Sequence, residues 1–338
     1  MVSMKDVAKM CGVSVATVSK VLNDYSDIGE ETKKKVREAA EQAGYFPNSS
    51  ARALKTKRTY NLGVLFVDDA RSGLTHDFFA GVLEAFKGKA ESCGYDITFT
   101  TGRSGNRTMS YYEHCRYRGV DGVVVACVDF YKDSVQELIR SELPVVTIDH
   151  VFDNCPAVLS DNISGMHELV SYVCRMGHRK IAYIHGADSS VSRNRISSFY
   201  QTLDECGIEI PDAYVRESGY RDTAAAEKYT RELLDLPEPP TCILYPDDFA
   251  ALGGIKAIRE RGLRIPGDIS IAGYDGIRLS QELSPKLTTV RQDTAAIGVS
   301  AAEKLIDMIE QPRRTSIEHL AIPGTLLTGE SIGYAAGR

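Results

Sequence analysis

Hydrophobic positions in the first 45 residues recur at helical spacing and predict three short helices. Each is bounded by residues that cap or end a helix, namely Ser3 and Gly12, Ser14 and Asn23-Asp24, and Gly29 and Gly44. Two short helices joined by a tight turn that contains glycine, with a third for support, are typical of a helix-turn-helix. The N-terminal pattern therefore predicts a small, separate all-helical head.

The pattern changes from Asn61 onward, where short apolar runs rich in β-forming residues alternate with helical stretches. The apolar runs span 62–67, 97–100, 122–127, 145–148, 181–184, 242–245 and 269–272, and the clearest helical stretches span 79–93, 163–176, 223–234 and 249–261. Continuous apolar strands alternating with helices indicate parallel sheets covered on both faces. The predicted fold is therefore α/β, with two Rossmann-like lobes and a cleft at the carboxyl ends of their strands.

Charge is unevenly distributed between these two regions. The chain of 338 residues carries a net charge of −6, yet its first 60 residues hold eleven Lys and Arg against seven Asp and Glu. The head is thus +4 and the remainder −10. A basic head on an acidic body fits a nucleic-acid-binding module joined to a domain that stays off DNA.

Composition argues against secretion, membrane insertion and metal binding. There is no charged and then apolar leader, and the apolar runs are too short to span a bilayer, so we expect a cytoplasmic protein. The eight cysteines form no CxxC pair and have no zinc spacing, so we interpret them as small buried hydrophobic residues. We expect no cofactor and no metal.

The second predicted helix carries the residues suited to reading DNA. Its N-terminal half would enter the major groove, where Val15 and Ala16 offer apolar contact to thymine methyls. Lys20, one turn further on, reaches a guanine edge or a phosphate, and Thr17 and Ser19 suit phosphates. The alternative is a generic helical hairpin in which Lys20 is only solvated.

Several short motifs resemble the LacI/GalR family of bacterial regulators. They are Lys5-Asp6-Val7-Ala8, Gly12-Val13-Ser14, Thr17-Val18-Ser19, Val21-Leu22-Asn23, Gly44-Tyr45, Pro47-Asn48, Ala51-Arg52 and Leu54 in the head, with Gly119-Val120-Asp121-Gly122 and Gly273-Tyr274-Asp275 among the later ones. The resemblance implies a DNA-binding regulator, a repressor controlled by a small molecule such as a sugar or sugar derivative. It also implies a helix-turn-helix head on a two-lobed body like the periplasmic binding proteins.

The resemblance also implies domain boundaries and further DNA contacts. Residues 1–46 would form the head, 47–60 a hinge helix, and 61–338 the effector-binding and dimerisation domain. Lobe one would comprise about 61–160 and 291–322, and lobe two about 161–290 and 323–338.

The implied DNA-binding set is Ser14, Val15, Ala16, Thr17, Ser19, Lys20, Asn23, Asn48, Ala51, Arg52 and Leu54. Leu54 would be a wedge in the minor groove, since an inserted apolar side chain kinks DNA; the alternative is packing against the body.

Three family positions for ligand contact match residues here: Asp161-Asn162, Arg195 and Asp248. A carboxylate and an arginine fork suit a ligand rich in hydroxyl groups. Tyr220 matches a position where an aromatic residue lines the pocket. The alternatives are a structural ion pair for Arg195 and Asp248, and a helix cap for Asp161.

The chain departs from the family pattern near the predicted cleft. Asp247 stands where the family usually has Asn, which favours a ligand that is cationic or donates hydroxyl groups. The loop from Asp68 to Phe79 looks longer than usual. We include His76 and Phe79 as candidate effector contacts, although a loop histidine is more often exposed.

Enzymatic function is not supported by the motifs. The letters of 329–333 match a GxSxG elbow, but no later Asp or His completes a triad. The alternatives to a regulator are a transporter's solute-binding protein and a sugar-metabolising enzyme with a DNA-binding head. We expect operator DNA, a small carbohydrate effector and a second copy of the chain as partners, because a near-palindromic operator needs two heads.

Overall fold

The computed structural model describes residues 2–22, 25–46, 58–67 and 73–335. The chain divides into two compact units, Met1–Tyr60 and Asn61–Arg338. Asn23 and most of the proposed hinge, including Asn48, Ala51, Arg52 and Leu54, lie outside the described residues.

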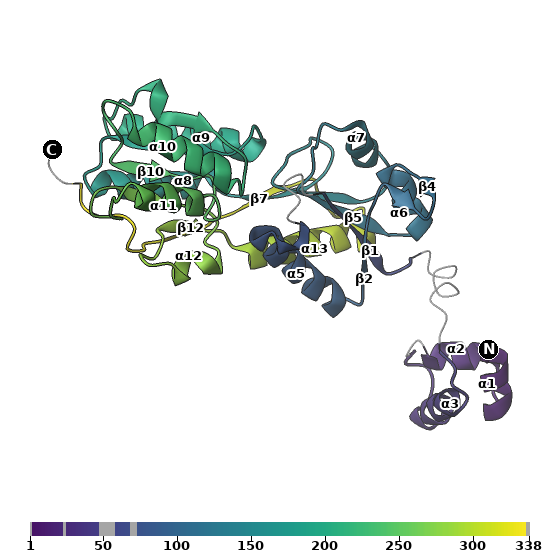
Figure 1. The fold of residues 1–338 in the computed structure, drawn as a ribbon. Coiled ribbons are helices and arrows are strands. Elements are labelled where there is room, and N and C mark those ends of the chain that lie inside the picture. Colours follow the sequence, from purple (N-terminus) through teal and green to yellow (C-terminus); the bar gives the residue numbers. More distant parts are fainter. Residues whose placement is uncertain (1, 23–24, 47–57, 68–72, 336–338) are drawn as a thin grey trace. The chain divides into compact units, whose positions relative to one another are not determined.

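The first unit contains the three predicted helices, α1 (Met4–Cys11), α2 (Val15–Leu22) and α3 (Glu30–Gln42) (Figure 1). They pack around Val7, Val18, Val21 and Val36, each at most 1% exposed. α1 ends at Gly12, whose φ of 66° is readily adopted by glycine. The head is therefore a helix-turn-helix with its own small core.

Lobe one of the second unit is built on a six-stranded parallel sheet in the order β13-β7-β6-β5-β1-β2. Its strands are β1 (Asn61–Phe66), β2 (Asp96–Phe99), β5 (Gly122–Ala126), β6 (Val145–Ile148), β7 (Ala157–Ser160) and β13 (His319–Ile322). Its helices are α5 (Asp77–Ser92), α6 (Tyr111–Arg118), α7 (Asp133–Ile139) and α13 (Thr294–Glu310), with a short turn η1 (Gly73–Thr75) and a small hairpin of β3 (Arg103–Ser104) and β4 (Arg107–Thr108).

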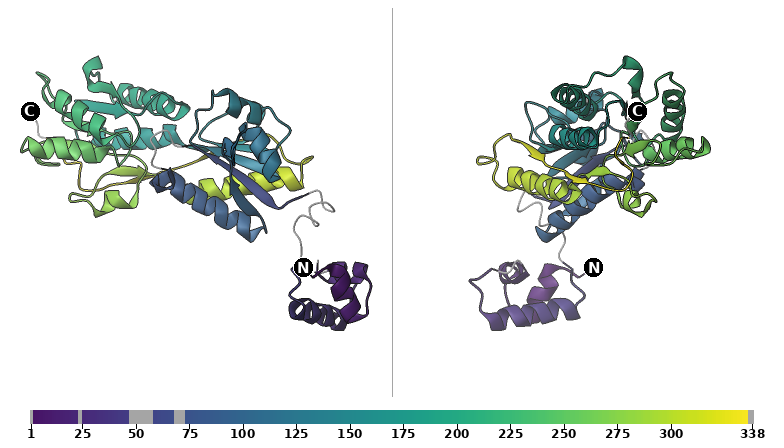
Figure 2. Two further views of the ribbon diagram at one scale, coloured as in Figure 1. Left: turned by 45° about the vertical axis from the view of Figure 1, so that its right-hand side comes forward. Right: turned by 90° about the vertical axis from the view of Figure 1, so that its left-hand side faces the viewer.

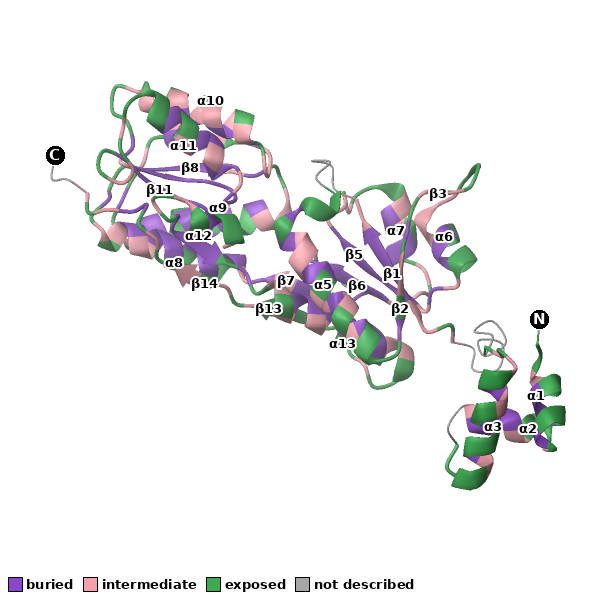
Figure 3. Cartoon of the chain, turned by 60° about the horizontal axis from the view of Figure 1, so that its bottom comes forward, coloured by how far each residue is buried: buried purple, intermediate pink, exposed green. Residues whose placement is uncertain are grey.

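Lobe two has a four-stranded parallel sheet in the order β11-β10-β8-β9. Its elements are β8 (Ile181–His185), β9 (Val215–Glu217), β10 (Cys242–Leu244), β11 (Ser270–Ala272), α8 (Asn162–Arg175), α9 (Ser190–Glu205), α10 (Thr223–Leu234), α11 (Ala251–Glu260), α12 (Arg278–Glu282) and a turn η2 (Asp212–Tyr214). Side chains alternate along β8, since Ile181 and Tyr183 join the core under α8 and α9, and Ala182 and Ile184 join the core under α10 and α11. Strands buried on both faces explain the continuous apolar runs in the sequence (Figure 3).

Three chain segments run between the lobes. Two of them, β12 (Thr289–Arg291) and β14 (Thr325–Leu327), pair with each other in an antiparallel ribbon. The third follows β7, where the backbone N–H of Asp161 donates to the carbonyl of Ile322 at 2.8 Å. The lobes are therefore connected by a narrow set of strands, and each lobe keeps its own sheet and helices (Figure 2).

The described ranges contain no helix that is long and apolar enough to cross a membrane. All eight cysteines lie within these ranges as free thiols. Four of them are buried, as the sequence predicts, but Cys93 is exposed.

Candidate functional site

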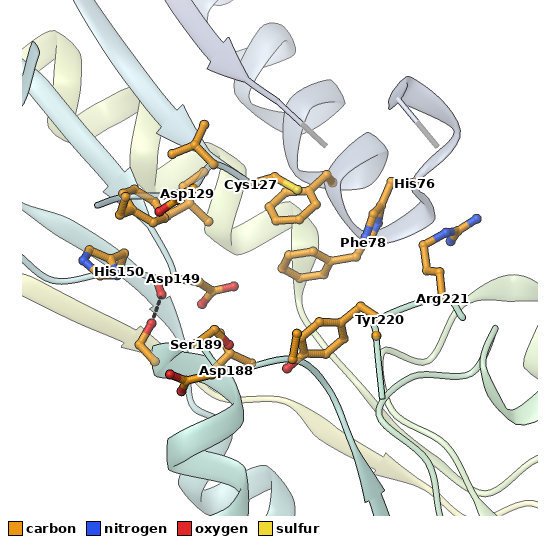
Figure 4. A pocket seen from close by; sticks show the side chains of 18 of the residues that line it. His76, Phe78, Cys127, Asp129, Asp149, His150, Asp188, Ser189, Tyr220 and Arg221 are labelled. Carbon is orange, nitrogen blue, oxygen red and sulfur yellow. Dashed lines mark hydrogen bonds between the residues drawn. The ribbon is translucent and has the colours of Figure 1, made fainter. Parts of the chain in front are cut away.

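A cavity of about 830 Å³ lies between the two lobes of the second unit (Figure 4). Segments that follow β5 and β6 line it from lobe one, and segments that follow β8, β9 and β11 line it from lobe two. Ligands of open α/β sheets bind outside the carboxyl ends of the strands, and this cavity has that location. It is the candidate ligand site.

Backbone strain is concentrated around the cavity. Five non-glycine residues in the described ranges have a positive φ, and four of them line it: Cys127 (52°), Asp149 (57°), Arg221 (58°) and Asp275 (101°). Such conformations cost on the order of 1–3 kcal/mol each and cluster where a ligand must be held. The positions of the strained residues and the carboxyl ends of the strands therefore indicate the same ligand site.

Arg195 is held in the cavity wall by contacts on several sides. It belongs to α9 and is 3% exposed. Its Nε donates to Oδ1 of Asn162 at 2.7 Å, and its Nη1 donates to the carbonyl of Pro246 at 2.9 Å. The guanidinium carbon lies 3.5 Å from the centre of the Tyr274 ring. The remaining nitrogen, Nη2, lies 3.9 Å from Oδ1 of Asp275.

Two buried carboxyls from facing lobes, Asp149 and Asp275, lie close enough to Arg195 for its positive charge to act on them. Asp149 follows β6 and accepts hydrogen bonds from the backbone N–H and the hydroxyl of Ser160, at 2.6 and 3.3 Å. Asp275 follows β11 and accepts from Nε2 of Gln292 at 2.6 Å. Burial raises the pKa of both carboxyls, and the charge of Arg195 offsets this only in part. Oε1 of Gln292, a residue that lines the cavity, is buried and has no hydrogen-bond partner in the described part of the chain.

The buried carboxyl of Asp275 makes stability depend on pH. Burial raises its pKa to about 7, against about 4 in an unfolded chain. The folded protein thus keeps a proton that the unfolded chain has lost, and this advantage disappears as pH rises through 7. We expect Asp275 to lower the free energy of unfolding by on the order of 2 kcal/mol between pH 5 and pH 8.

Asp275→Asn should therefore flatten the pH dependence and raise stability at pH 8, as measured by urea unfolding at both pH values. Asp188→Asn is the matched control, because the Asp188 side chain is 74% exposed and paired with Arg193. An unchanged pH profile in Asp275→Asn would show that this carboxyl is ionised throughout the range.

The ring of Tyr220 forms an aromatic wall of the cavity and packs against the backbone of Gly186. A Cβ on Gly186 would lie 2.3 Å from Cζ of the Tyr220 ring, so the ring occupies the space of a side chain. The Tyr220 hydroxyl lies 2.8 Å from Oγ of Ser192, which fixes the outer end of the ring. Glycine at 186 is thus required for the position of this wall.

Gly186→Ala should displace the Tyr220 ring and weaken ligand binding by roughly tenfold or more, since a displacement near 1 Å in a binding site is costly. Ligand-induced thermal shift measures the effect. Gly88→Ala is the control, because a Cβ on Gly88 meets nothing within 4 Å. Equal ligand responses in the two variants would show that the Tyr220 wall does not contact the ligand.

The head exposes the residues expected to read DNA. Val15, at 40% exposed, and Ala16 lie on the surface at the start of α2, whereas Val18 on the same helix is buried. The backbone N–H of Thr17 donates to Oγ of Ser14 at 3.0 Å, which confirms Ser14 as the cap of this helix.

Lys20 is not simply solvated, because its ammonium pairs with the carboxylate of Asp27. Both side chains are about half exposed, at 45% and 52%. An exposed ion pair contributes little to stability, so it does not prevent Lys20 from turning to DNA.

Comparison with known proteins identifies the family. Residues 3–48 match the bacterial regulatory proteins of the lacI family, and residues 170–332 match a periplasmic binding protein-like domain. The probable HTH-type transcriptional repressor ExuR of Bacillus subtilis (strain 168) is 32% identical over 315 residues, which cover 92% of this chain and 93% of that protein. The chain belongs to the LacI family.

Two other LacI-family relatives match over nearly the full length. The ribose operon repressor of Haemophilus influenzae (strain ATCC 51907 / DSM 11121 / KW20 / Rd) is 32% identical over 336 residues, 98% of this chain and 99% of that protein. The structure of the lac repressor dimer bound to operator and the anti-inducer ONPF matches with a TM-score of 0.80 and 27% identity, over 98% of each chain. This chain is therefore a DNA-binding transcriptional regulator, and the match of its head favours that function over a solute-binding protein.

The structure brings four of the seven predicted effector residues to the cavity of this LacI-family body: His76, Phe79, Arg195 and Tyr220. His76 is 8% exposed, so the expectation of an exposed loop histidine is wrong. Its ring packs edge-on against Phe79, with ring centres 4.9 Å apart.

The other three predicted residues are not among those that line the cavity. Asp161 caps α8, where Oδ1 accepts from the N–H of Ser164 at 3.0 Å. Asn162 holds Arg195 from behind. Asp248 is 2% exposed and accepts from the N–H of Ile277 at 2.9 Å, and it forms no ion pair with Arg195 among the described contacts. Each of these three side chains bonds to a neighbouring backbone or side-chain group, although the buried Oδ1 of Asp248 has no hydrogen-bond partner among the described residues.

Sequence reasoning missed Asp149, Asp275 and Gln292 as candidate ligand contacts. Asp149 directly follows the predicted strand 145–148, so the rule that ligands bind at strand carboxyl ends could have found it. Asp275 belongs to the Gly273-Tyr274-Asp275 motif, which we used only for the family resemblance. Its hydrogen bond with Gln292 joins residues that are distant in sequence, so no local pattern indicates it.

Proposed function

We propose that this protein is a cytoplasmic transcriptional repressor that binds a near-palindromic operator as a homodimer and responds to a carbohydrate in its cavity. We further infer that it regulates without catalysing a reaction. The convergence of Arg195, Asp149 and Asp275 on the cavity carries the proposal for the effector. A guanidinium fork beside carboxylates offers several donors and acceptors to neighbouring hydroxyls, and Tyr220 offers a flat face to a sugar ring.

Binding to DNA is assigned to the head and to the hinge. We propose that residues 1–46 place the start of α2 in the major groove. The proposed contacts are Ser14, Val15, Ala16, Thr17, Ser19, Lys20 and Asn23, followed by Asn48, Ala51, Arg52 and Leu54 in a hinge of residues 47–60. Phosphate contacts would set the register, and Val15, Ala16 and Lys20 would contribute sequence preference.

The effector is proposed to act through two conformations of the body. Arg221 of lobe two donates through Nη1 to Oδ2 of Asp77 in lobe one at 2.8 Å, and Ser190 donates through Oγ to the carbonyl of Asp149 at 2.8 Å. Such contacts change whenever the lobes rotate or close. A ligand that binds one arrangement more tightly shifts the equilibrium between the two. Only this difference in ligand affinity can change the affinity of the head for DNA.

The proposal is tested by selecting operator DNA from a random pool and screening sugars, sugar phosphates, nucleosides and amino sugars by thermal shift. A ligand that binds only the folded state raises the unfolding temperature. We expect a carbohydrate among the hits, and we expect it to change the mobility shift of the selected DNA. Failure to bind any DNA, or turnover of a sugar, would contradict the proposal.

A further inference from the structure

The cavity extends outward from its buried end into a second set of side chains. At the inner end, Arg195 and Gln292 are 3% and 7% exposed. At the outer end, the side chain of Asp188 is 74% exposed and Tyr131 is 70% exposed. Asp129, Asp188 and His150 gather on one side of the cavity, away from His76 and Arg221 (Figure 4).

The outer end is an organised aromatic cluster. Phe130 and His150 stack with ring centres 4.2 Å apart and an angle of 6° between the planes. Tyr131 meets His150 edge-on with ring centres 5.9 Å apart, and the tilted ring of Phe152 has its centre 4.7 Å from that of His150. A single exposed tyrosine needs no explanation, but Tyr131 lies at the rim of a cavity and packs against His150, which Phe130 and Phe152 hold in turn.

Polar groups surround this surface on both lobes. Asp129 comes from lobe one, and Asp188 and Ser189 come from lobe two, before α9. Arg193 of α9 approaches from the same side, and hydrogen bonds from its side chain to Tyr131 and Asp188 raise its pKa. The outer end thus combines an aromatic face with carboxylate acceptors, the combination that also lines the inner end.

We propose that this outer end is a second sugar subsite, so that the effector is a disaccharide rather than a monosaccharide. The inference rests on the proposed function of the cavity. One ring would be held by Arg195, Asp275 and Gln292, and the second would lie on Tyr131 with its hydroxyls donating to Asp129 and Asp188. The volume of about 830 Å³ lies near the upper end for small-molecule sites, which span roughly 300–1,000 Å³.

Titration calorimetry on the full-length protein tests this with monosaccharides and with disaccharides built from them. The expected result is that one disaccharide binds roughly tenfold tighter than either of its component sugars. Tyr131→Ala should remove that gain and leave monosaccharide affinity unchanged. Tyr131→Phe keeps the ring and should keep the gain.

Tyr117→Ala is the matched control, since Tyr117 is a 65% exposed tyrosine of the same lobe that does not line the cavity. A monosaccharide that binds as tightly as every disaccharide would overturn the second subsite while leaving the proposed function intact. If aryl glycosides alone bound more tightly than monosaccharides, the occupant of the outer end would not be a second sugar ring. Failure of every carbohydrate to bind would overturn both proposals.

Discussion

Arg195→Ala should abolish the response to the effector and lower the free energy of unfolding by about 3 kcal/mol or more. The substitution removes the partner of the buried Asp275 carboxylate and the positive charge near Asp149, and it removes the donors to Asn162 and Pro246. Thermal unfolding with and without the ligand measures both effects. We expect a lower unfolding temperature and no shift on adding ligand.

Arg195→Lys separates binding from folding. It keeps a buried positive charge but loses the planar guanidinium fork. The protein should therefore still fold, but its affinity for the ligand should fall by roughly 100-fold or more. Arg264→Ala is the control, because the Arg264 side chain is 77% exposed in its pair with Asp268. Normal ligand affinity in Arg195→Lys would place the effector elsewhere.

Ala16→Glu should reduce operator affinity by roughly 100-fold or more, because it puts a negative charge where α2 is proposed to meet the DNA. Ala16 is exposed and lies next to Val15 at the start of the helix, so the head should remain folded. Mobility shift on the selected operator measures the loss.

The same variant carries its own control. The cavity belongs entirely to Asn61–Arg338, so the ligand-induced thermal shift of Ala16→Glu should equal that of the original protein. Undiminished operator binding in Ala16→Glu would show that another surface of the head reads the DNA.

Local signals explain why much of the fold could be predicted. Gly12 and Ser14 mark helix ends through backbone requirements that involve only neighbouring residues, and both helix ends lie where expected. The buried parallel strands were recognisable because both faces must be apolar, as in Val145–Ile148. By contrast, β13 (His319–Ile322) is mostly exposed at the sheet edge and pairs with β7, far away in sequence, so neither periodicity nor composition indicates it.

The candidate site was harder to predict because it depends on which way side chains turn at the ends of strands. Asp248 and Asp275 both follow strands of lobe two, and both are acidic residues in short loops. Only the packing decides that Asp248 accepts a backbone N–H from Ile277 and that Asp275 faces Arg195 in the cavity. The kinds of side chain at the site were therefore predicted better than the directions in which they point.

The most direct test of the account is the affinity of the full-length protein for its effector, measured with and without saturating operator. If the cavity controls DNA binding, the two affinities differ, and by linkage the effector changes operator affinity by the same factor. We predict a difference of roughly fivefold or more, in either direction, and its loss in Arg195→Lys. Equal effector affinities in the presence and absence of operator would contradict the central claim that occupancy of this cavity regulates the DNA-binding head.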